Sequence, residues 1–203
     1  MKLYFTPRTR ATRSRWLLEE LGVPYELVKL DPSKHENKTA AYLAVHPFGE
    51  VPALVDGDVT LFESSAICLY LADRFPEKQL APQPGSAERG YYYQWMLFAE
   101  VSIEPEVKEF YQPAELPEEK GSAHLQAELA RHRTRLDDLL KVVEDGLNGR
   151  EFLVGGRFSA ADLVTASILH LANTLNLLEG HPRLLEYVIL HTRRPALRRA
   201  LSS

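Results

Sequence analysis

The spacing of apolar residues changes partway along the chain. Over roughly the first third, short runs with the alternating pattern of β-strands lie between segments with the spacing of amphipathic helices. Beyond residue 86 the strand pattern disappears, and apolar residues recur at steps of three or four. The pattern therefore predicts an α/β unit followed by an all-helical unit.

The first half is expected to contain strand, helix, strand, loop, two strands and helix. Gly22 supplies a helix stop, Asp56-Gly57-Asp58 is a hairpin signal between two β-rich runs, and Ser64 or Ser65 can cap the last helix. The first two strands are expected to be parallel through a right-handed crossover, which gives a βαβ unit followed by ββα. These elements are expected at residues 2–5, 9–21, 25–30, 51–55, 59–62 and 66–75.

The second half is predicted to be helical throughout. Pro105 should kink or break an aromatic-rich helix over residues 87–111, and an amphipathic helix should span 125–147. Ser159 and Asp162 have the spacing of a capping box and open a central helix that is apolar on nearly all sides. The arginines of the last two short helices are expected to be solvated cations.

Proline and glycine are concentrated between these halves and indicate a linker. The predicted domains are residues 1–76 and 87–203, joined by a linker over 77–86.

Composition excludes several classes of function. The 203 residues include 24 Lys and Arg against 28 Asp and Glu, so no broad basic field points to nucleic acid. Cys68 is the single cysteine, which excludes a disulfide framework or a multi-cysteine metal site and is typical of the cytoplasm. No apolar run is long enough for a membrane helix, so we expect no membrane partner.

Three motifs in this order resemble those of the cytosolic glutathione transferases, and the resemblance covers essentially the whole chain. They are His46-Pro47-Phe48-Gly49-Glu50-Val51-Pro52-Ala53-Leu54, Phe62-Glu63-Ser64-Ser65-Ala66-Ile67 and Phe158-Ser159-Ala160-Ala161-Asp162. The resemblance implies a thioredoxin-like N-terminal domain, a helical C-terminal domain, a cis Val51-Pro52 bond and a homodimer. It implies a bacterial enzyme with a serine- or threonine-type turn, whose class stays open.

An enzyme that uses glutathione must stabilise a thiolate, because a free thiol is mostly protonated at neutral pH. A hydroxyl donor, a helix N-terminus and nearby cations serve this purpose, and residues 7–15 supply all three. The resemblance places Thr9 at the activating position and Arg10 at the cysteine position of the beta-like class. Arg10 is the second candidate, and Tyr4 on the first strand is the third.

The resemblance also implies partners for the rest of glutathione. Val51 offers its backbone beside Pro52, Glu63 and Ser64 meet the γ-glutamyl group, and Lys38 meets the glycine carboxylate. Glu50 departs from the family pattern. A carboxylate at this position repels an anionic ligand unless a cation balances its charge.

The second substrate is expected to be a small apolar electrophile near Trp95, Phe98, Glu104 and Tyr111. The expected activity is conjugation of glutathione, which acts as co-substrate, with no other cofactor and no metal. Two alternatives use the same fold: glutathione-dependent reduction of disulfides or peroxides, and a non-catalytic interaction or regulatory protein.

Overall fold

The computed structural model describes residues 1–111 and 121–202. The chain divides into two units: Met1–Ala81 together with the C-terminal segment from Arg193, and Pro82–Thr192. The elements of the first unit are β1 (Lys2–Phe5), α1 (Ala11–Leu21), β2 (Glu26–Lys29), η1 (Pro32–Lys34), η2 (Glu36–Lys38), α2 (Ala40–Leu43), β3 (Ala53–Asp56), β4 (Val59–Phe62), α3 (Ser64–Arg74), η3 (Pro76–Lys78) and α9 (Pro195–Leu201). Those of the second are α4 (Ala87–Leu97), the π-helical segment η4 (Phe98–Ile103), α5 (Glu104–Lys108), α6 (Gly121–Leu147), α7 (Ala160–Thr174) and α8 (Pro182–Thr192).

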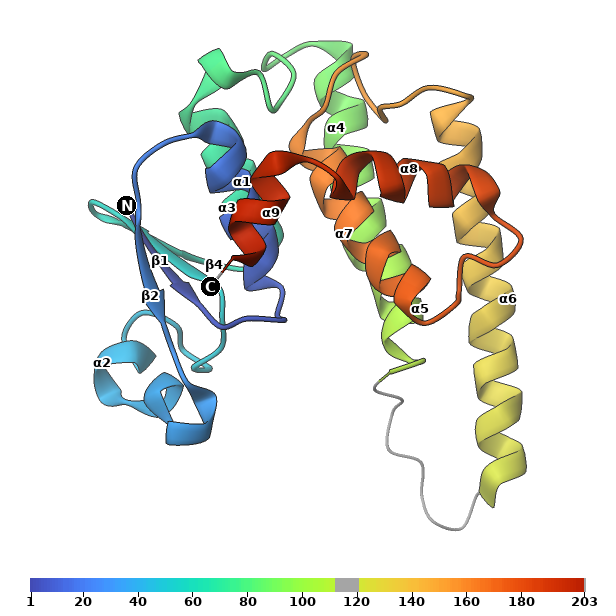
Figure 1. Cartoon of the computed structure of the whole chain (residues 1–203), viewed down its shortest axis with the longest axis horizontal. Coiled ribbons are helices and arrows are strands. Elements are labelled where there is room, and N and C mark those ends of the chain that lie inside the picture. The colour runs from blue at the N-terminus through green and yellow to red at the C-terminus, as the bar shows by residue number, and fades with distance from the viewer. Residues whose placement is uncertain (112–120, 203) are drawn as a thin grey trace. The chain divides into compact units, whose positions relative to one another are not determined.

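The four strands of the first unit form one mixed sheet in the order β2-β1-β3-β4 (Figure 1). β1 and β2 are parallel, as expected of a βαβ unit, and β3 is antiparallel to both β1 and β4. The βαβ and ββα order predicted from the sequence is confirmed. β3 begins at Ala53 rather than at Val51, because Pro52 has no N–H to contribute to a ladder.

Alternation along β1 decides which face of the sheet each helix covers. Leu3 and Phe5 are buried, as are the apolar residues of α1 and most of those of α3, and the two helices pack against each other. Tyr4 points to the opposite face, where its ring lies 5.0 Å from that of Tyr42 in α2. Tyr4 is therefore a packing residue between the sheet and α2.

The C-terminal helix α9 packs along α1 and is held there by two ion pairs. Arg194 forms a bidentate pair with Glu20, at 2.6 and 2.9 Å, and Arg199 pairs with Glu19 at 2.7 Å. The sequence-based expectation of solvated cations is wrong for both arginines. Their partners lie about 180 residues earlier in the chain, and a local pattern carries no signal for such pairing.

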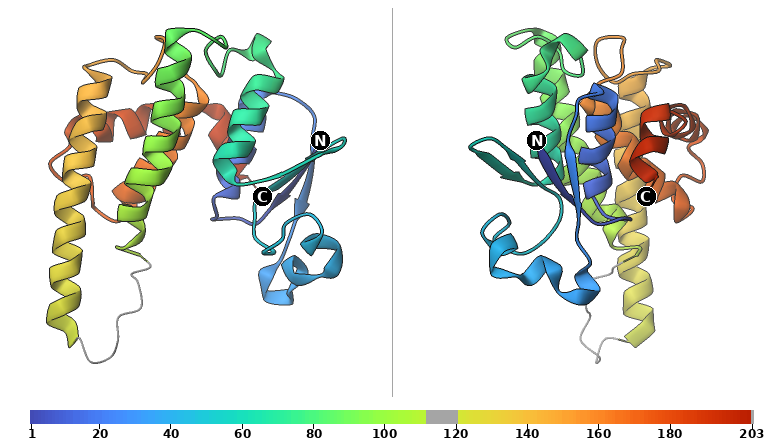
Figure 2. Two further views of the ribbon diagram at one scale, coloured as in Figure 1. Left: turned by 180° about the vertical axis from the view of Figure 1, so that it is seen from behind. Right: turned by 60° about the vertical axis from the view of Figure 1, so that its left-hand side comes forward.

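The second unit is built around α7, which packs against α4, η4 and α8 (Figure 2). Its Asp162 carboxylate accepts the Ser159 N–H at 2.9 Å, as the capping box predicted. The same carboxylate accepts the Leu153 N–H at 2.9 Å and the Tyr187 hydroxyl at 3.0 Å. One buried acidic group thereby joins the start of α7, the loop before it and α8.

The aromatic-rich helix is interrupted close to Pro105, as predicted. α4 ends at Leu97 and continues as the wider turns of the π-helical segment η4. α5 then starts at Glu104, with Pro105 in its first turn. Proline has no N–H to donate and its ring crowds the carbonyl four residues earlier, so the regular helical bonding stops before it.

The start of α3 differs from the sequence expectation. The helix begins at Ser64, and the residue before it, Glu63, has φ 69° and makes no capping bond with its side chain. Neither Ser64 nor Ser65 caps the helix, because both lie inside its first turn. Among the described residues, no helix combines the length and the hydropathy needed to cross a bilayer.

Candidate functional site

The topology of the sheet brings the predicted glutathione-binding segments to one edge. Tyr4, Ala53 and Phe62 are aligned across β1, β3 and β4, and β3 runs opposite to its two neighbours. The turn after β1, the residues before β3 and the start of α3 therefore meet at the carboxyl end of β1 (Figure 1). β2 is parallel to β1, so the segment that leads to Lys38 leaves the sheet at the same edge.

The turn between β1 and α1 carries Thr9, whose hydroxyl is already hydrogen-bonded. It donates to the Thr6 carbonyl at 2.7 Å and accepts the Ala11 N–H at 3.2 Å. These bonds fix the Thr9 hydroxyl in the turn before α1. The hydroxyl can donate to a bound sulfur only by turning away from Thr6.

The arginines of this turn have different environments. Arg10 is exposed beside the start of α1, whereas Arg13 and Arg15 on the helix are buried. The Arg15 guanidinium lies over the Phe5 ring, 5.1 Å from its centroid. The segment is therefore not the uniform basic face that its sequence suggests, and Arg10 is its exposed helix-start cation.

Two hydrogen bonds connect the turn before Val51 to the segment that contains Lys38. Asn37 donates its side-chain amide to the Gly49 carbonyl at 2.7 Å, and the Lys38 ammonium donates to the Phe48 carbonyl, also at 2.7 Å. Gly49 has φ +61°, and a Cβ there would lie 2.2 Å from the Asn37 carbonyl oxygen. Only glycine allows the two segments to approach this closely.

Glu50 and Val51 follow this turn at the sheet edge. The Tyr42 hydroxyl donates to the Glu50 carbonyl, and burial, with Tyr4 nearby, raises the pKa of Tyr42, so it remains a donor. The Glu50 side chain is exposed, and the Val51-Pro52 bond is cis, as the resemblance implied. Within the described residues, no hydrogen bond reaches the N–H or carbonyl of Val51.

The first turn of α3 contains two buried hydroxyls that have no partner among the described residues. Ser64 and Ser65 are 2% and 8% exposed, and neither hydroxyl oxygen has a hydrogen bond within the described part of the chain. The first N–H groups of a helix also lack internal acceptors. The exposed carboxylate of Glu63 stands directly before this turn. Buried hydroxyls and free N–H groups at a helix start suit a carboxylate ligand.

The residues predicted for the second substrate all belong to the second unit. Trp95 is 7% exposed and packs beside Gly146, where a Cβ would lie 2.2 Å from the indole ring. Its ring meets Phe98 edge-on at 5.8 Å. Glu104 is 4% exposed and Tyr111 is 43% exposed. These positions favour packing roles for Trp95 and Glu104 and leave Tyr111 the most accessible of the four.

Sequence comparisons match both halves to one family. The glutathione S-transferase N-terminal domain matches residues 1–73, and the C-terminal domain of the same family matches residues 126–189. Glutathione S-transferase GstA of Escherichia coli O157:H7 is 30% identical over 206 aligned residues, covering 100% of this chain and 98% of that protein. This chain belongs to the glutathione S-transferase family.

Solved glutathione transferase structures agree over nearly the whole chain. The enzyme of Methylococcus capsulatus is 31% identical with a TM-score of 0.84, covering 98% of this chain and 96% of that one. A sphingomonad glutathione S-transferase, solved in complex with glutathione, is 30% identical with a TM-score of 0.80, covering 99% and 97%. The glutathione transferase fold, a thioredoxin-like unit and a helical unit, is thus confirmed.

Two features of this glutathione transferase do not follow from sequence reasoning. The sequence suggests Ser65 only as an alternative cap, although its hydroxyl is buried without a hydrogen-bond partner among the described residues, like that of Ser64. It gives Asn37 no structural role, whereas the Asn37 side-chain amide donates to the Gly49 carbonyl. Two adjacent serines are a visible signal for the first feature, but the second depends on a contact twelve residues away.

No metal site is evident among the residues described. No three His, Cys, Asp or Glu side chains within the described ranges gather closely enough to hold an ion.

Proposed function

We propose that residues 1–76 bind glutathione at the sheet edge and that the enzyme transfers its thiolate to a small apolar electrophile. The observation that carries this proposal is the first turn of α3, where two buried hydroxyls have no partner among the described residues at the start of an 11-residue helix. Such a turn is suited to a ligand carboxylate.

Each part of glutathione has a matching group at this edge. Ser64 and the α3 N–H groups receive the γ-glutamyl carboxylate, and the exposed Glu63 receives its ammonium. The cysteinyl backbone pairs with the N–H and carbonyl of Val51, in the manner of an added strand. Lys38 receives the glycine carboxylate and balances the charge of Glu50.

The reaction needs the glutathione sulfur as a thiolate. In our proposal the Thr9 hydroxyl turns from the Thr6 carbonyl and donates to the sulfur, while the α1 N-terminus and Arg10 add positive potential. The thiolate then attacks the electrophilic carbon of the second substrate. A C–S bond forms, and the carbon either releases a leaving group with its bonding electron pair or opens a polarised double bond, whose far atom takes up a proton. Phe98 and Tyr111 are the accessible aromatic candidates for that substrate.

We further propose that two copies of the chain form a homodimer. Phe48 in the first unit is 70% exposed, and in the second unit Leu97 and Val101 are 61% and 68% exposed. Apolar side chains of this size, four residues apart on one helical segment, indicate a surface that a partner covers.

Replacing Ser64 by alanine is expected to weaken glutathione binding about 10- to 100-fold without lowering stability. The Ser64 hydroxyl has no hydrogen-bond partner among the described residues, so its removal leaves no protein group unpaired. A hydrogen bond to a charged ligand, in contrast, is worth about 1.5 to 3 kcal/mol. Calorimetric titration with glutathione and thermal unfolding measure the two effects.

Ser86→Ala is the matched control for Ser64. Its hydroxyl accepts the Arg89 N–H at 3.2 Å as the N-cap of α4, so its loss should lower stability by about 1 kcal/mol and leave binding unchanged. Unchanged glutathione affinity in Ser64→Ala would remove this residue from the site.

Replacing Thr9 by alanine is expected to lower kcat/KM for conjugation about 10- to 100-fold, the equivalent of one hydrogen bond to a charged sulfur. The thiolate absorbance of bound glutathione at neutral pH should fall with it, because the pKa of the bound thiol rises. Thr9→Ser keeps the hydroxyl and should restore both signals, and Thr60→Ala, on the exposed face of β4, should change neither.

The same measurements separate the alternatives. Loss of the thiolate signal in Arg10→Ala with retention in Thr9→Ala would assign activation to Arg10. Glutathione binding without any thiolate signal in the wild type would favour a non-catalytic protein, consistent with a Thr9 hydroxyl that stays on Thr6. A thiolate signal with turnover of disulfides or peroxides but of no electrophile would assign the chain to reduction.

A further inference from the structure

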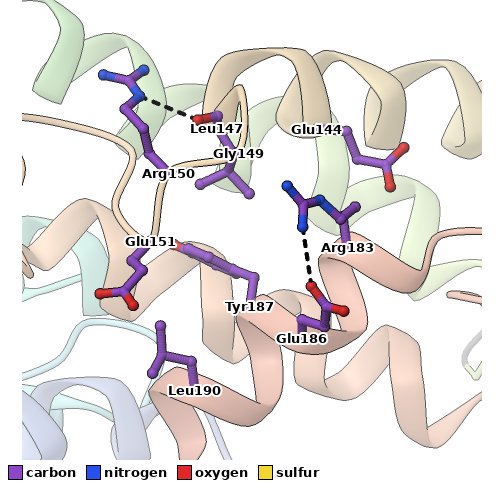
Figure 3. A pocket seen from close by; sticks show the side chains of 9 residues that line it. All are labelled: Glu144, Leu147, Gly149, Arg150, Glu151, Arg183, Glu186, Tyr187 and Leu190. Atoms are coloured by element: carbon purple, nitrogen blue, oxygen red, sulfur yellow. Dashed lines mark hydrogen bonds and ion pairs between the residues drawn. The ribbon is translucent and has the colours of Figure 1, made fainter.

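A pocket of about 320 Å³ lies in the second unit, between the end of α6 and one side of α8 (Figure 3). It is formed by the last turns of α6, the loop that follows and the first three turns of α8. None of its lining residues belongs to the glutathione site proposed above. Its size is at the lower end of the range for small-molecule sites, so a ligand of amino-acid size would fill it.

One side of the pocket is apolar. Leu147 and Tyr187 are 5% and 4% exposed, while Leu190 is 42% exposed at the rim. The Tyr187 ring lies between Gly149 and Leu190 and forms the base of the pocket (Figure 3). Its hydroxyl donates a hydrogen bond to the Asp162 carboxylate, which fixes the position of the ring. A fixed aromatic face beside a leucine suits an apolar side chain.

Arg183 provides a positive group next to this surface. Its guanidinium lies close to Gly149, where a Cβ would be 3.3 Å from Nη2. Its contact with Glu186 is long, at 3.4 Å, and both side chains are more than 60% exposed. An exposed pair of this kind is weak, so a ligand carboxylate can replace Glu186 on Arg183.

The other charged groups set the net charge that the pocket tolerates. Arg150 donates to the Leu147 and Gly146 carbonyls at the end of α6, and in the structure it makes no ion pair with a described residue. The Glu144 carboxylate lies 3.1 Å from Nδ1 of His181, and Glu186 and Glu151 are exposed. Three carboxylates and two guanidinium groups disfavour a ligand of large net charge of either sign.

We propose that this pocket binds a free amino acid with a large apolar side chain. The side chain lies on Tyr187 and Leu190, the carboxylate pairs with Arg183, and the ammonium pairs with Glu186 once that residue is displaced from Arg183. A zwitterion satisfies both signs without adding net charge, whereas a simple anion leaves the displaced Glu186 carboxylate unpaired.

The test is a calorimetric titration of the full chain with L-phenylalanine in the presence of saturating S-hexylglutathione. Saturable binding is expected, at least ten-fold tighter than for phenylacetate, phenethylamine or glycine, each of which lacks one of the three groups. Equal affinity for phenylacetate would overturn the zwitterion assignment. Loss of binding in the presence of S-hexylglutathione would place the amino acid at the glutathione site and overturn the proposal.

Variants of the pocket locate the binding. Arg183→Ala should weaken L-phenylalanine binding at least ten-fold, because a charge-assisted pair is lost. Arg135→Ala, which removes an exposed arginine from the same unit, is the matched control and should bind as the wild type does. Conjugating activity should be unchanged in both variants. Wild-type affinity in Arg183→Ala, or no binding by the wild type, would contradict the proposal.

Discussion

Replacing Asp162 by alanine is expected to lower the free energy of unfolding by about 3 to 4 kcal/mol at neutral pH, because four donors lose their buried acceptor. Those donors are the N–H groups of Leu153 and Ser159 and the hydroxyls of Ser159 and Tyr187. They belong to the loop, the cap and the helix that surround α7, so the loss is expected to loosen the whole second unit. Urea denaturation measures the change.

Two further variants provide a comparison for the loss of stability in Asp162→Ala. Tyr187→Phe removes one of the donors and should cost about 1 kcal/mol, the typical value of one hydrogen bond. Asp145→Ala removes an exposed aspartate from α6 and should be close to neutral. A loss of less than about 1 kcal/mol in Asp162→Ala would show that water replaces the carboxylate and that the network does not hold the unit together.

Stability should also depend on pH through Asp162. Burial raises the pKa of this carboxyl from 3.8 to about 6, although the hydrogen bonds from Leu153, Ser159 and Tyr187 oppose that rise. Between these values the folded chain retains a proton that the unfolded chain has released. Raising the pH through this window therefore lowers the contribution of Asp162 to stability, by up to about 3 kcal/mol.

The alanine variant lacks this titration. The destabilisation caused by Asp162→Ala should therefore be larger near pH 4 than near pH 7, as measured by urea midpoints at both values. A larger destabilisation at pH 7 would show that the hydrogen bonds outweigh burial and that the carboxylate is the preferred form throughout.

Replacing Gly49 by alanine is expected to destabilise the first unit by about 2 to 5 kcal/mol and to weaken glutathione binding more than ten-fold. A left-handed φ costs a non-glycine residue about 1 to 2 kcal/mol, and overpacking adds about 1 to 3 kcal/mol. The overlap is with backbone, since the added Cβ would lie 2.2 Å from the Asn37 carbonyl oxygen. The two segments must separate, which moves Lys38 away from Val51.

Gly57→Ala is the matched control for this prediction. Gly57 has φ +59°, nearly the same as Gly49, but a Cβ there would meet nothing within 4 Å. It should therefore show only the conformational cost and leave glutathione binding unchanged. Thermal unfolding and glutathione titration of both variants separate strain from overlap, and equal effects in the two would show that contact with Asn37 is unimportant.

Much of this protein follows from local sequence pattern. Alternation and helical periodicity predict the strands, the hairpin at Asp56-Gly57-Asp58, the central helix and the capping box of Ser159 and Asp162, because each depends on neighbours within a few residues. The motif around Val51 and Pro52 points to the family, and both family domains match. Local pattern and motif together therefore account for the order of the elements and for where most candidate site residues lie along them.

The tertiary structure decided what each side chain does. Whether Thr9 is free to donate depends on the Thr6 carbonyl, and whether Ser64 caps its helix depends on where α3 begins. The pairing of Arg194 with Glu20 and the contact of Asn37 with Gly49 join segments that local pattern cannot relate. Hydrogen bonds and ion pairs form between groups brought together by the fold, so the sequence determined which elements form and only the folded chain determined which of their polar groups remain available for a ligand.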